Sequence, residues 1–299
     1  MFFGEGTGER KEVLLSTMKN KKKAPPCVLT IAGSDSGAGA GIQADLKTIA
    51  AQKVYGLSAI TAITAQNTLA VEKAEVLPAE LVEAQIDAVL RDFSVSAVKT
   101  GMLGDEKTVE VVAARLKHFA IPKVVVDPVM IAKSGDSLLT EGAQKALREK
   151  LLPVALVVTP NIPETEALCG WPIQDWGALQ EAAHFLYRQG PSFVLIKGGH
   201  YAEEEDLITD VLFDGKKFYY YRASRIQTKN THGTGCTYAA AIAAHLARGR
   251  TVPLAVKAAR LYLQSIMPHG LPLGKGHGPL DHFYGFREAA LPGSGCSRF

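Results

Sequence analysis

The sequence predicts an α/β fold in which helices cover both faces of a mainly parallel sheet, giving three layers. Short runs rich in β-branched apolar residues recur along the chain, and stretches with helical spacing of apolar residues separate them. These runs are apolar throughout, as in strands buried on both faces of a sheet. The chain has 299 residues, a length that a single α/β domain can reach, so we expect one domain.

The apolar runs give the predicted strands, which are Val28–Ala32, Ser58–Thr64, Ala97–Thr100, Val124–Asp127, Leu156–Thr159 and Phe193–Lys197. A helix is expected after Pro78, because proline favours the first turn of a helix and apolar residues then recur at helical spacing from Leu81 to Leu90. Two more helices are expected at Tyr238–Ala247 and Leu254–Met267.

One segment, Ile208–Tyr221, has a different pattern. Its two apolar runs flank Asp214-Gly215, a dipeptide that favours a tight turn between antiparallel strands, so we expect a hairpin at one edge of the sheet. Beyond about Pro268 the chain is rich in glycine, proline and histidine, which predicts loop or a poorly ordered tail. We therefore expect a disordered extension at 1–25, a folded domain at 26–287 and a tail at 288–299.

Composition and charge narrow the class of protein. The net charge is +3, and the excess of basic residues lies in the N-terminal extension, which leaves the domain balanced and argues against nucleic-acid binding. No apolar stretch approaches the roughly 18 to 20 residues that span a bilayer, and the N-terminus lacks the pattern of a secretory signal. The 4 cysteines show no paired spacing, so a soluble protein of the cytoplasm is expected.

The most specific candidate site is the turn Asn230–Cys236, which precedes a predicted helix. Glycines at 233 and 235 allow consecutive amides to point at one place, and the positive end of the helix favours an anion there. The same helix dipole is expected to favour the thiolate of Cys236, although this residue can also be a small buried residue at a helix start. Gly233, Thr234, Gly235 and Cys236 are therefore the candidate phosphate-transfer site.

Two further segments follow predicted strands. The glycine-rich loop Ala32–Gly41 matches neither a dinucleotide fingerprint nor a Walker A motif; it is either a loop that closes over a small ligand or a tight turn for helix packing. Asn161 and Glu164 lie one helical turn apart and could hold a hydrated magnesium ion, or simply begin a helix. The Lys197-Gly198-Gly199 turn is a weaker candidate for framing a nucleotide.

Eight segments extend this picture, in chain order AGSDSGAGAGIQADLKT, ITAQNT, KTGMLG, VVVDPVMIAKSGD, TPNIPE, IKGGH, NTHGTGCT and GKGHGPLDHFY. Together they resemble the ribokinase-like superfamily and, within it, the hydroxymethylpyrimidine/phosphomethylpyrimidine kinases of thiamine biosynthesis. The resemblance runs from about Val28 to Phe283. It implies a three-layer α/β/α sandwich, ATP near the late glycine turn, Mg²⁺, a pyrimidine pocket made by the early loops, and a homodimer or larger assembly.

The resemblance also implies roles for single residues. The pyrimidine contacts would be Gly33, Asp45, Gln66, Met102 and Val129. The nucleotide contacts would be Asn161, Lys197, Thr228 and Gly235, and the magnesium-proximal carboxylates Glu164 and Asp127. Gln66 suits an aminopyrimidine edge, because its amide offers a donor and an acceptor together. Lys133 is a candidate partner for a substrate phosphate, or else a surface lysine in a mobile loop.

One position separates branches of the superfamily. Many members end the glycine turn with an aspartate that acts as base on the acceptor hydroxyl, whereas this chain has Cys236, as hydroxymethylpyrimidine kinases do. A fixed carboxylate would repel an acceptor that already carries a phosphate of about −1.5 to −2 charge, and a neutral thiol would not. We therefore expect phosphorylation of 4-amino-5-hydroxymethyl-2-methylpyrimidine and then of its monophosphate. A pyridoxal or pyridoxine kinase, a dual enzyme and a non-catalytic sensor remain open.

Overall fold

The computed structural model describes residues 24–130, 140–198 and 206–290. Within these ranges nine strands form one sheet in the order β3-β2-β1-β4-β5-β6-β7-β8-β9. The pairs from β2 to β7 are parallel, whereas β3, β8 and β9 pair antiparallel. The strands are β1 Cys27–Asp35, β2 Tyr55–Gln66, β3 Val71–Val76, β4 Val95–Thr100, β5 Val124–Val126, β6 Val157–Val158, β7 Phe193–Ile196, β8 Leu207–Phe213 and β9 Phe218–Ser224.

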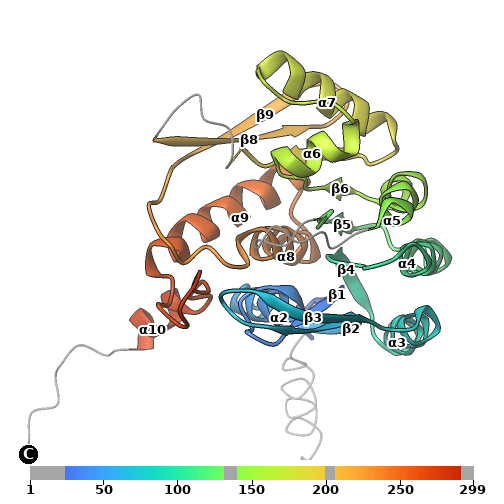
Figure 1. Ribbon diagram of the computed structural model, residues 1–299, viewed down its shortest axis with the longest axis horizontal. Helices are drawn as coiled ribbons and strands as arrows, with labels where there is room; N and C mark the ends of the chain where they lie inside the picture. The colour runs from blue at the N-terminus through green and yellow to red at the C-terminus, as the bar shows by residue number, and fades with distance from the viewer. Residues whose placement is uncertain (1–23, 131–139, 199–205, 291–299) are drawn as a thin grey trace, which may run out of the picture.

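Helices cover both faces of this sheet, so the predicted three-layer α/β/α sandwich is confirmed (Figure 1). One side carries α3 to α7 and the other α2, α8 and α9. Their bounds are α2 Gly41–Ala51, α3 Ala79–Asp92, α4 Glu106–His118, α5 Glu141–Ala146, α6 Ile162–Cys169, α7 Trp176–Arg188, α8 Thr234–Ala247, α9 Val252–Ile266 and α10 Tyr284–Ala290. A π-helical turn at Leu147–Leu151 and 3₁₀ turns at Leu152–Val154 and Met267–His269 complete the described helices.

Two hydrophobic layers hold the sandwich together, one on each face of the sheet. In β5 the side chains of Val124 and Val126 join the layer under α3 to α7, while Val125 joins the layer under α8 and α9. A strand buried on both faces must be apolar at every position, which is why these strands read as continuous apolar runs. Helix α8 is buried on all sides, and its alanines at 239–241 and 243–244 let it approach the sheet closely.

The predicted strands are all present, and the hairpin predicted around Asp214-Gly215 is β8 with β9. Strand β3 was not predicted, because residues 72–76 are all exposed and so show no alternation of apolar and polar side chains. The segment after Pro268 is loop as expected, but it is well anchored: the His277 amide donates to the Thr68 carbonyl and the Asn230 side chain to the Gly270 carbonyl. Helix α10 then crosses the boundary expected at residue 287.

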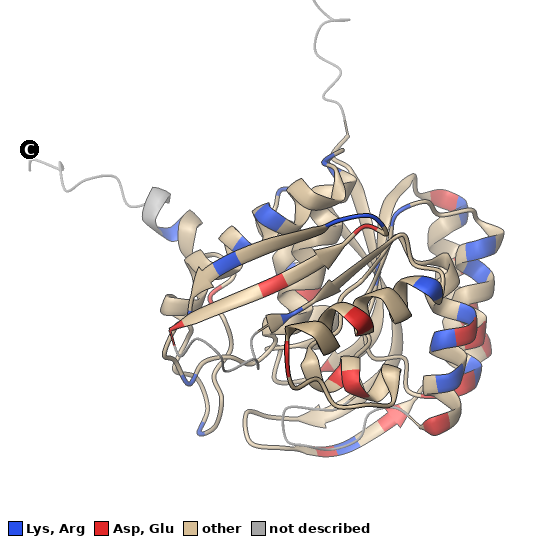
Figure 2. Ribbon diagram, turned by 90° about the horizontal axis from the view of Figure 1, so that it is seen from above, with Lys and Arg blue, Asp and Glu red and all other residues tan. Residues whose placement is uncertain are grey.

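Acidic and basic residues are interspersed over the outer helices (Figure 2). Arg115 of α4 pairs with Asp87 at 2.6 Å and with Glu83 at 3.5 Å, both on α3, and Arg91 pairs with Asp87 within α3. The exposed Arg91 and Glu83 contribute little stability through such pairs, about 0 to 1 kcal/mol each, whereas the closer pair of Arg115 and Asp87 is partly buried. No helix among the described residues is long and apolar enough to cross a membrane.

Two buried histidines predict acid sensitivity. Burial lowers the pKa of His245 to about 4, helped by Arg250 and Arg248, and burial also lowers the pKa of His282 to about 4, helped by Lys47. Both are therefore neutral in the folded protein, and unfolding below their ordinary value of 6.5 takes up protons. Their contribution is complete above about pH 6.5 and is lost as the pH falls toward 4, by about 2 kcal/mol per histidine near pH 5.

Thermal unfolding measured at pH 7.5 and pH 5 checks this expectation. The His245→Leu variant also removes a buried ring nitrogen without a partner in the described part of the chain. Its Tm should fall less between pH 7.5 and pH 5 than the Tm of the unmodified protein, by about 2 to 4 °C for each kcal/mol of histidine contribution that is removed. His118→Gln, at an exposed position on α4, is the control and should leave the difference unchanged. An undiminished loss in His245→Leu would contradict the assignment.

Candidate active site

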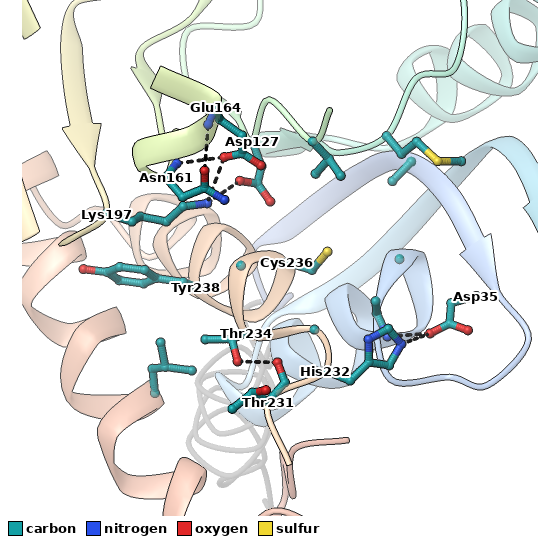
Figure 3. A pocket seen from close by; sticks show the side chains of 18 of the residues that line it. Asp35, Asp127, Asn161, Glu164, Lys197, Thr231, His232, Thr234, Cys236 and Tyr238 are labelled. Carbon is teal, nitrogen blue, oxygen red and sulfur yellow. Dashed lines mark hydrogen bonds and ion pairs between the residues drawn. The ribbon is translucent and has the colours of Figure 1, made fainter. Parts of the chain in front are cut away.

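A cavity of about 710 Å³ opens at the carboxyl ends of the parallel strands, where open α/β sheets bind their ligands (Figure 3). Both glycine segments singled out in the sequence line it. The early loop contributes Gly33 and the late turn Cys236, and Gln66 of β2 lines the same space. The turn and the expected pyrimidine contact therefore share one cavity.

The late turn has the geometry of an anion site. Gly233 has φ of 80°, and a Cβ there would lie 1.8 Å from the Gly39 carbonyl oxygen, so only glycine fits. The first i to i−4 bond of α8 runs from the Thr237 amide to the Gly233 carbonyl at 2.9 Å. The amides of Gly235 and Cys236 precede that bond and have no acceptor within the helix, so they are available to a phosphate.

Three charged side chains gather on the opposite wall of the cavity. The Lys197 ammonium lies 2.8 Å from Oδ1 of Asp127 and 3.8 Å from Oε2 of Glu164, and it takes this place because Lys197 pairs with Asn161 across the ends of β6 and β7. Burial alone would lower the pKa of Lys197, but Asp127 and Glu164 raise it above its ordinary value. Burial raises the pKa of Glu164 to about 7 against the opposing effect of Lys197. The lysine is therefore a fixed cation.

Asn161 and Glu164 also begin helix α6. The Glu164 amide donates to Oδ1 of Asn161 and the Asn161 amide to Oε2 of Glu164, each at 2.8 Å, which is a complete capping box. The helix-start interpretation is therefore correct, and it does not compete with a ligand role, because both side chains line the cavity as well. The cap holds Glu164 in place beside Lys197.

The carboxylates fit a magnesium ion. Thr159 and Lys197 both donate hydrogen bonds to Oδ1 of Asp127. A Cβ on Gly235 would lie 3.8 Å from the other oxygen, Oδ2, which therefore faces the late glycine turn. The described residues contain no cluster of three or more acidic, histidine or cysteine side chains that could hold a metal alone. Magnesium does not require one, since it commonly takes one or two carboxylates together with substrate phosphates and water.

The side of the cavity next to Lys197 rests on a buried cluster of hydrogen bonds around Asp210, which the sequence did not reveal. Asp210 of β8 accepts hydrogen bonds from the Gly198 amide at 3.0 Å, the Tyr238 hydroxyl at 2.8 Å and the Arg260 Nε at 2.8 Å. Tyr238 and Arg260 both line the cavity. The cluster thus ties the turn after Lys197 to α8 and α9.

The expected pyrimidine contacts Gly33, Gln66, Met102 and Val129 all line the cavity. The backbone of Gln66 is held by Ser36, whose hydroxyl accepts from the Gln66 amide and donates to the Gln66 carbonyl, each at 2.8 Å. The Thr64 hydroxyl donates to the Ser34 carbonyl at 2.8 Å and lies 3.2 Å from the side-chain oxygen of Gln66. The backbone at Gln66 is therefore held in place, and its side-chain amide borders the cavity.

Two expected site residues do not line the cavity. Asp45 does not line the cavity: it is completely buried, where the Thr30 hydroxyl and the Lys99 ammonium bond its Oδ2 at 2.6 and 2.8 Å. A direct pyrimidine contact from Asp45 is therefore not supported. Thr228 also lies outside the lining, and its hydroxyl accepts from the Asn230 amide at 3.2 Å. Lys133 falls outside the described residues.

One pair of site residues was missed from the sequence. His232 Nε2 lies 2.8 Å from Oδ2 of Asp35, and the amides of Gly39 and Ala40 donate to the same oxygen at 3.0 and 2.8 Å (Figure 3). Burial acts to raise the pKa of Asp35, but His232 and the amides of Ala40 and Gly37 together lower it. The pair joins the early glycine loop to the late glycine turn. Both residues stand inside the quoted motifs, but 197 positions of sequence separate them.

The expected thiolate of Cys236 is a prediction that the structure corrects. The side chain borders the cavity, yet it is so closely surrounded that burial raises the pKa of the thiol to about 11, with Lys99 opposing this effect and Asp45 and Asp127 adding to it. The helix dipole is a weaker influence than this loss of water. Cys236 is therefore a neutral thiol at pH 7.

Fold and site together define the class: an amide cradle, a fixed lysine and two carboxylates at the carboxyl ends of a parallel sheet make a ribokinase-like small-molecule kinase. The family model of phosphomethylpyrimidine kinase matches residues 35–281. The chain belongs to this family.

Known relatives agree with this placement. The hydroxymethylpyrimidine/phosphomethylpyrimidine kinase of Streptomyces coelicolor is 48% identical over 264 residues, 88% of this chain and 97% of the relative. The thiamine biosynthesis bifunctional protein of Geobacter sulfurreducens is 49% identical over 255 residues, 85% of this chain, which spans 52% of that longer protein. The solved pyridoxal kinase of Staphylococcus aureus in complex with AMP-PCP and pyridoxal has a TM-score of 0.80 at 36% identity, covering 87% of this chain and 94% of that one.

Proposed function

We propose that this chain uses ATP and magnesium to phosphorylate 4-amino-5-hydroxymethyl-2-methylpyrimidine and then its monophosphate, giving the diphosphate, in thiamine biosynthesis. One observation carries the proposal: Gly235 and Cys236, whose backbone amides have no acceptor within α8, line the same cavity as Gln66. A phosphoryl group bound by the amides of Gly235 and Cys236 would lie in the same cavity as a pyrimidine bound by the Gln66 side chain. The names of the Streptomyces coelicolor and other relatives support this choice of substrate.

The residues divide the chemistry among them. The amides of Gly235 and Cys236 stabilise charge on the phosphoryl group in transfer, as oriented donors do in phosphoryl-transfer sites. Lys197 supplies a fixed positive charge beside the transferred group. Asp127 and Glu164 would hold magnesium, which would neutralise part of the negative charge of the phosphates. Asn161 positions Glu164 through the capping box and Lys197 through the adjoining strand ends.

The two acceptors make different demands on Cys236. The first acceptor is an alcohol, whose proton must leave as its oxygen attacks the γ-phosphorus. The second is a phosphate, which is already ionised at neutral pH and needs no base. A thiol that is neutral at rest does not repel this anion, and in the first step it can serve as thiolate. The raised pKa of Cys236, about 11, supports the neutral resting state.

Pyridoxal is the second candidate acceptor, because the solved pyridoxal kinase of Staphylococcus aureus shares the fold at 36% identity. Release of ADP measured with each acceptor at matched concentrations separates the two. We expect kcat/KM for the hydroxymethylpyrimidine to exceed that for pyridoxal by at least about tenfold. This ratio corresponds to a difference of about 1.4 kcal/mol in activation free energy. Mass analysis should find both mono- and diphosphate products.

A clear preference for pyridoxal would overturn the substrate assignment while leaving the kinase assignment intact. Absence of ADP release with every acceptor would instead favour a ligand sensor. The amide cradle, the fixed lysine and the acid pair speak against a sensor, since binding without transfer requires no such combination.

We further propose that residues 26–287 carry the whole activity and that the protein works as a homodimer or larger assembly in the cytoplasm, without nucleic-acid or membrane partners. The match of the family model at 35–281 supports the domain bounds. The unpaired cysteines Cys27, Cys169 and Cys236 suit a reducing compartment.

A further inference from the structure

A completely buried ion pair lies beside the cavity and has no part in the mechanism above. Lys99 at the end of β4 and Asp45 of α2 are both 0% exposed, and the Lys99 ammonium lies 2.8 Å from Oδ2 of Asp45. Removing two charges from water costs several kcal/mol per ion, and an apolar pair of similar size is often as stable or more so. Stability is therefore a weak explanation for this pair.

The pair is also incompletely satisfied. The Thr30 hydroxyl bonds the same oxygen of Asp45 that the lysine does, at 2.6 Å, and Oδ1 is buried without a partner in the described part of the chain. A purely structural pair would be expected to use both oxygens. Oδ2 of Asp45 thus binds the Lys99 ammonium, whereas Oδ1 has no hydrogen bond to offset the cost of its burial.

The pair has a direction with respect to the cavity. Lys99 borders the cavity together with Cys236, whereas Asp45 lies behind it and does not. Of the charges that act on the Cys236 thiol, the ammonium of Lys99 has the largest effect, larger than that of Asp45. Lys99 lies on the same face of β4 as Ala97, which packs in the layer with α8, the helix that carries Cys236. The positive end of the pair is therefore the end that borders the cavity on the side of α8.

Other charged groups around the sulfur come from three elements. Asp45 stands on α2, Asp127 follows β5 and Lys197 follows β7. The ammonium of Lys197 lies 2.8 Å from Asp127 and 3.8 Å from Glu164, so two carboxylates share its charge, whereas Lys99 is paired with Asp45 alone. The Gly41 amide at the start of α2 has a smaller effect, which also lowers the pKa of the thiol. Lys99 is thus the cation available to stabilise negative charge on Cys236.

We propose that Lys99, held by Asp45, is a positioning residue that stabilises Cys236 as thiolate and so supports deprotonation of an alcohol acceptor. The inference rests on the proposed kinase function. In the step concerned, the acceptor oxygen forms a bond to the γ-phosphorus and its proton passes to the sulfur. The bond from the γ-phosphorus to the bridging oxygen breaks, and ADP leaves with the electron pair. The sulfur, which gave its own proton to water before this step, is thereby a neutral thiol again.

The test uses the full chain with the pair replaced as a unit, Lys99→Met with Asp45→Asn, which is close in shape and leaves no buried charge unpaired. The readout is the rate at which iodoacetamide alkylates Cys236 from about pH 7 to 9, followed on the Cys236 peptide by mass spectrometry. This requires no substrate, so its outcome is separate from that of the proposed function. Circular dichroism establishes that the variant is folded.

Loss of the Lys99 cation should raise the pKa of the Cys236 thiol by about 1 unit or more. The remaining thiolate is more nucleophilic, which offsets nearly half of that change, so alkylation should slow at least about threefold at each pH. The alcohol step should slow at least about tenfold and the phosphate step less than threefold. An alkylation rate equal to that of the unmodified protein would overturn the proposal.

Two further variants complete the test. Thr30→Val removes a hydrogen bond to Asp45 but keeps both charges, so it should lower stability and leave the alkylation rate unchanged; a slowed rate there would point to a purely structural effect. Asp45→Asn alone leaves Lys99 buried without its counterion, and burial then favours the neutral amine, so alkylation should slow as in the paired variant. A folded Asp45→Asn protein that is alkylated as fast as the unmodified protein would contradict the proposal.

Discussion

Gly235→Val is expected to lower kcat/KM for ATP-dependent phosphorylation by at least about a thousandfold. Removing a single oriented donor from a transition-state site costs about a hundred- to a thousandfold. A valine here does more, because its methyl groups enter the space that lies between the turn, Lys197 and Asp127. A Cβ alone would already lie 3.5 Å from Nζ of Lys197 and 3.8 Å from Oδ2 of Asp127.

The same distances explain why this variant should fold. Both are ordinary van der Waals contacts, and Gly235 does not have the positive φ that disfavours other residues. Gly233 would be a poor choice, because a Cβ there meets the Gly39 carbonyl at 1.8 Å and any loss of activity could be loss of fold. The matched control is Gly285→Ala on α10, where a Cβ has no neighbour within 4 Å. Full activity in Gly235→Val would remove the basis of the phosphate-site assignment.

The parts of the structure that the sequence predicted are those set by local rules. Val124–Val126 is apolar at every position because two helical layers cover it, and this pattern is visible without coordinates. The turn at Gly233 to Cys236 was predicted for a similar reason, since glycines ahead of a helix leave few other uses for its first amides. The hairpin around Asp214-Gly215 likewise carries its signal within a few residues.

The parts that escaped prediction depend on how distant segments pack. Asp35 and His232 meet only because the early loop and the late turn face each other at the edge of the sheet. Asp45 was expected in the pocket from resemblance alone, and its neighbours Thr30 and Lys99 take it instead into the buried layer behind the cavity. Strand β3 is exposed along most of its length and has no pattern of burial to detect.

Cys236 shows where a local argument gives the wrong sign. Its place in the first turn of α8 favours the thiolate through the helix dipole, an effect of roughly 0.3 to 2 kcal/mol. Burial opposes it and prevails, raising the thiol pKa to about 11. The extent of burial depends on the packing of α2, β4 and α8 around one sulfur atom, which no single segment encodes.

Cys236→Ala is expected to affect the two transfers unequally. The alcohol step should slow by about a hundred- to ten-thousandfold, the usual contribution of a positioned general base. The phosphate step should slow less than about tenfold, because its acceptor oxygen is already ionised and positioning by the amide cradle remains. Each acceptor is supplied separately, and the mono- and diphosphates are quantified by mass spectrometry. Cys169→Ala, which changes a cysteine that does not line the cavity, should leave both rates unchanged.

Cys236→Asp separates the charge of this side chain from its basicity. A carboxylate at this place can still accept the hydroxyl proton, so the alcohol step should exceed that of Cys236→Ala. It should also repel an acceptor of about −1.5 to −2 charge, and the phosphate step should fall below that of Cys236→Ala by at least about tenfold, since two charges near 4 Å interact by several kcal/mol at a partly buried site. Equal losses in both steps for both variants would mean that Cys236 acts through packing alone. Opposite selectivity in the two variants would instead show that a side chain able to be neutral is what lets one cavity serve an alcohol and a phosphate in turn.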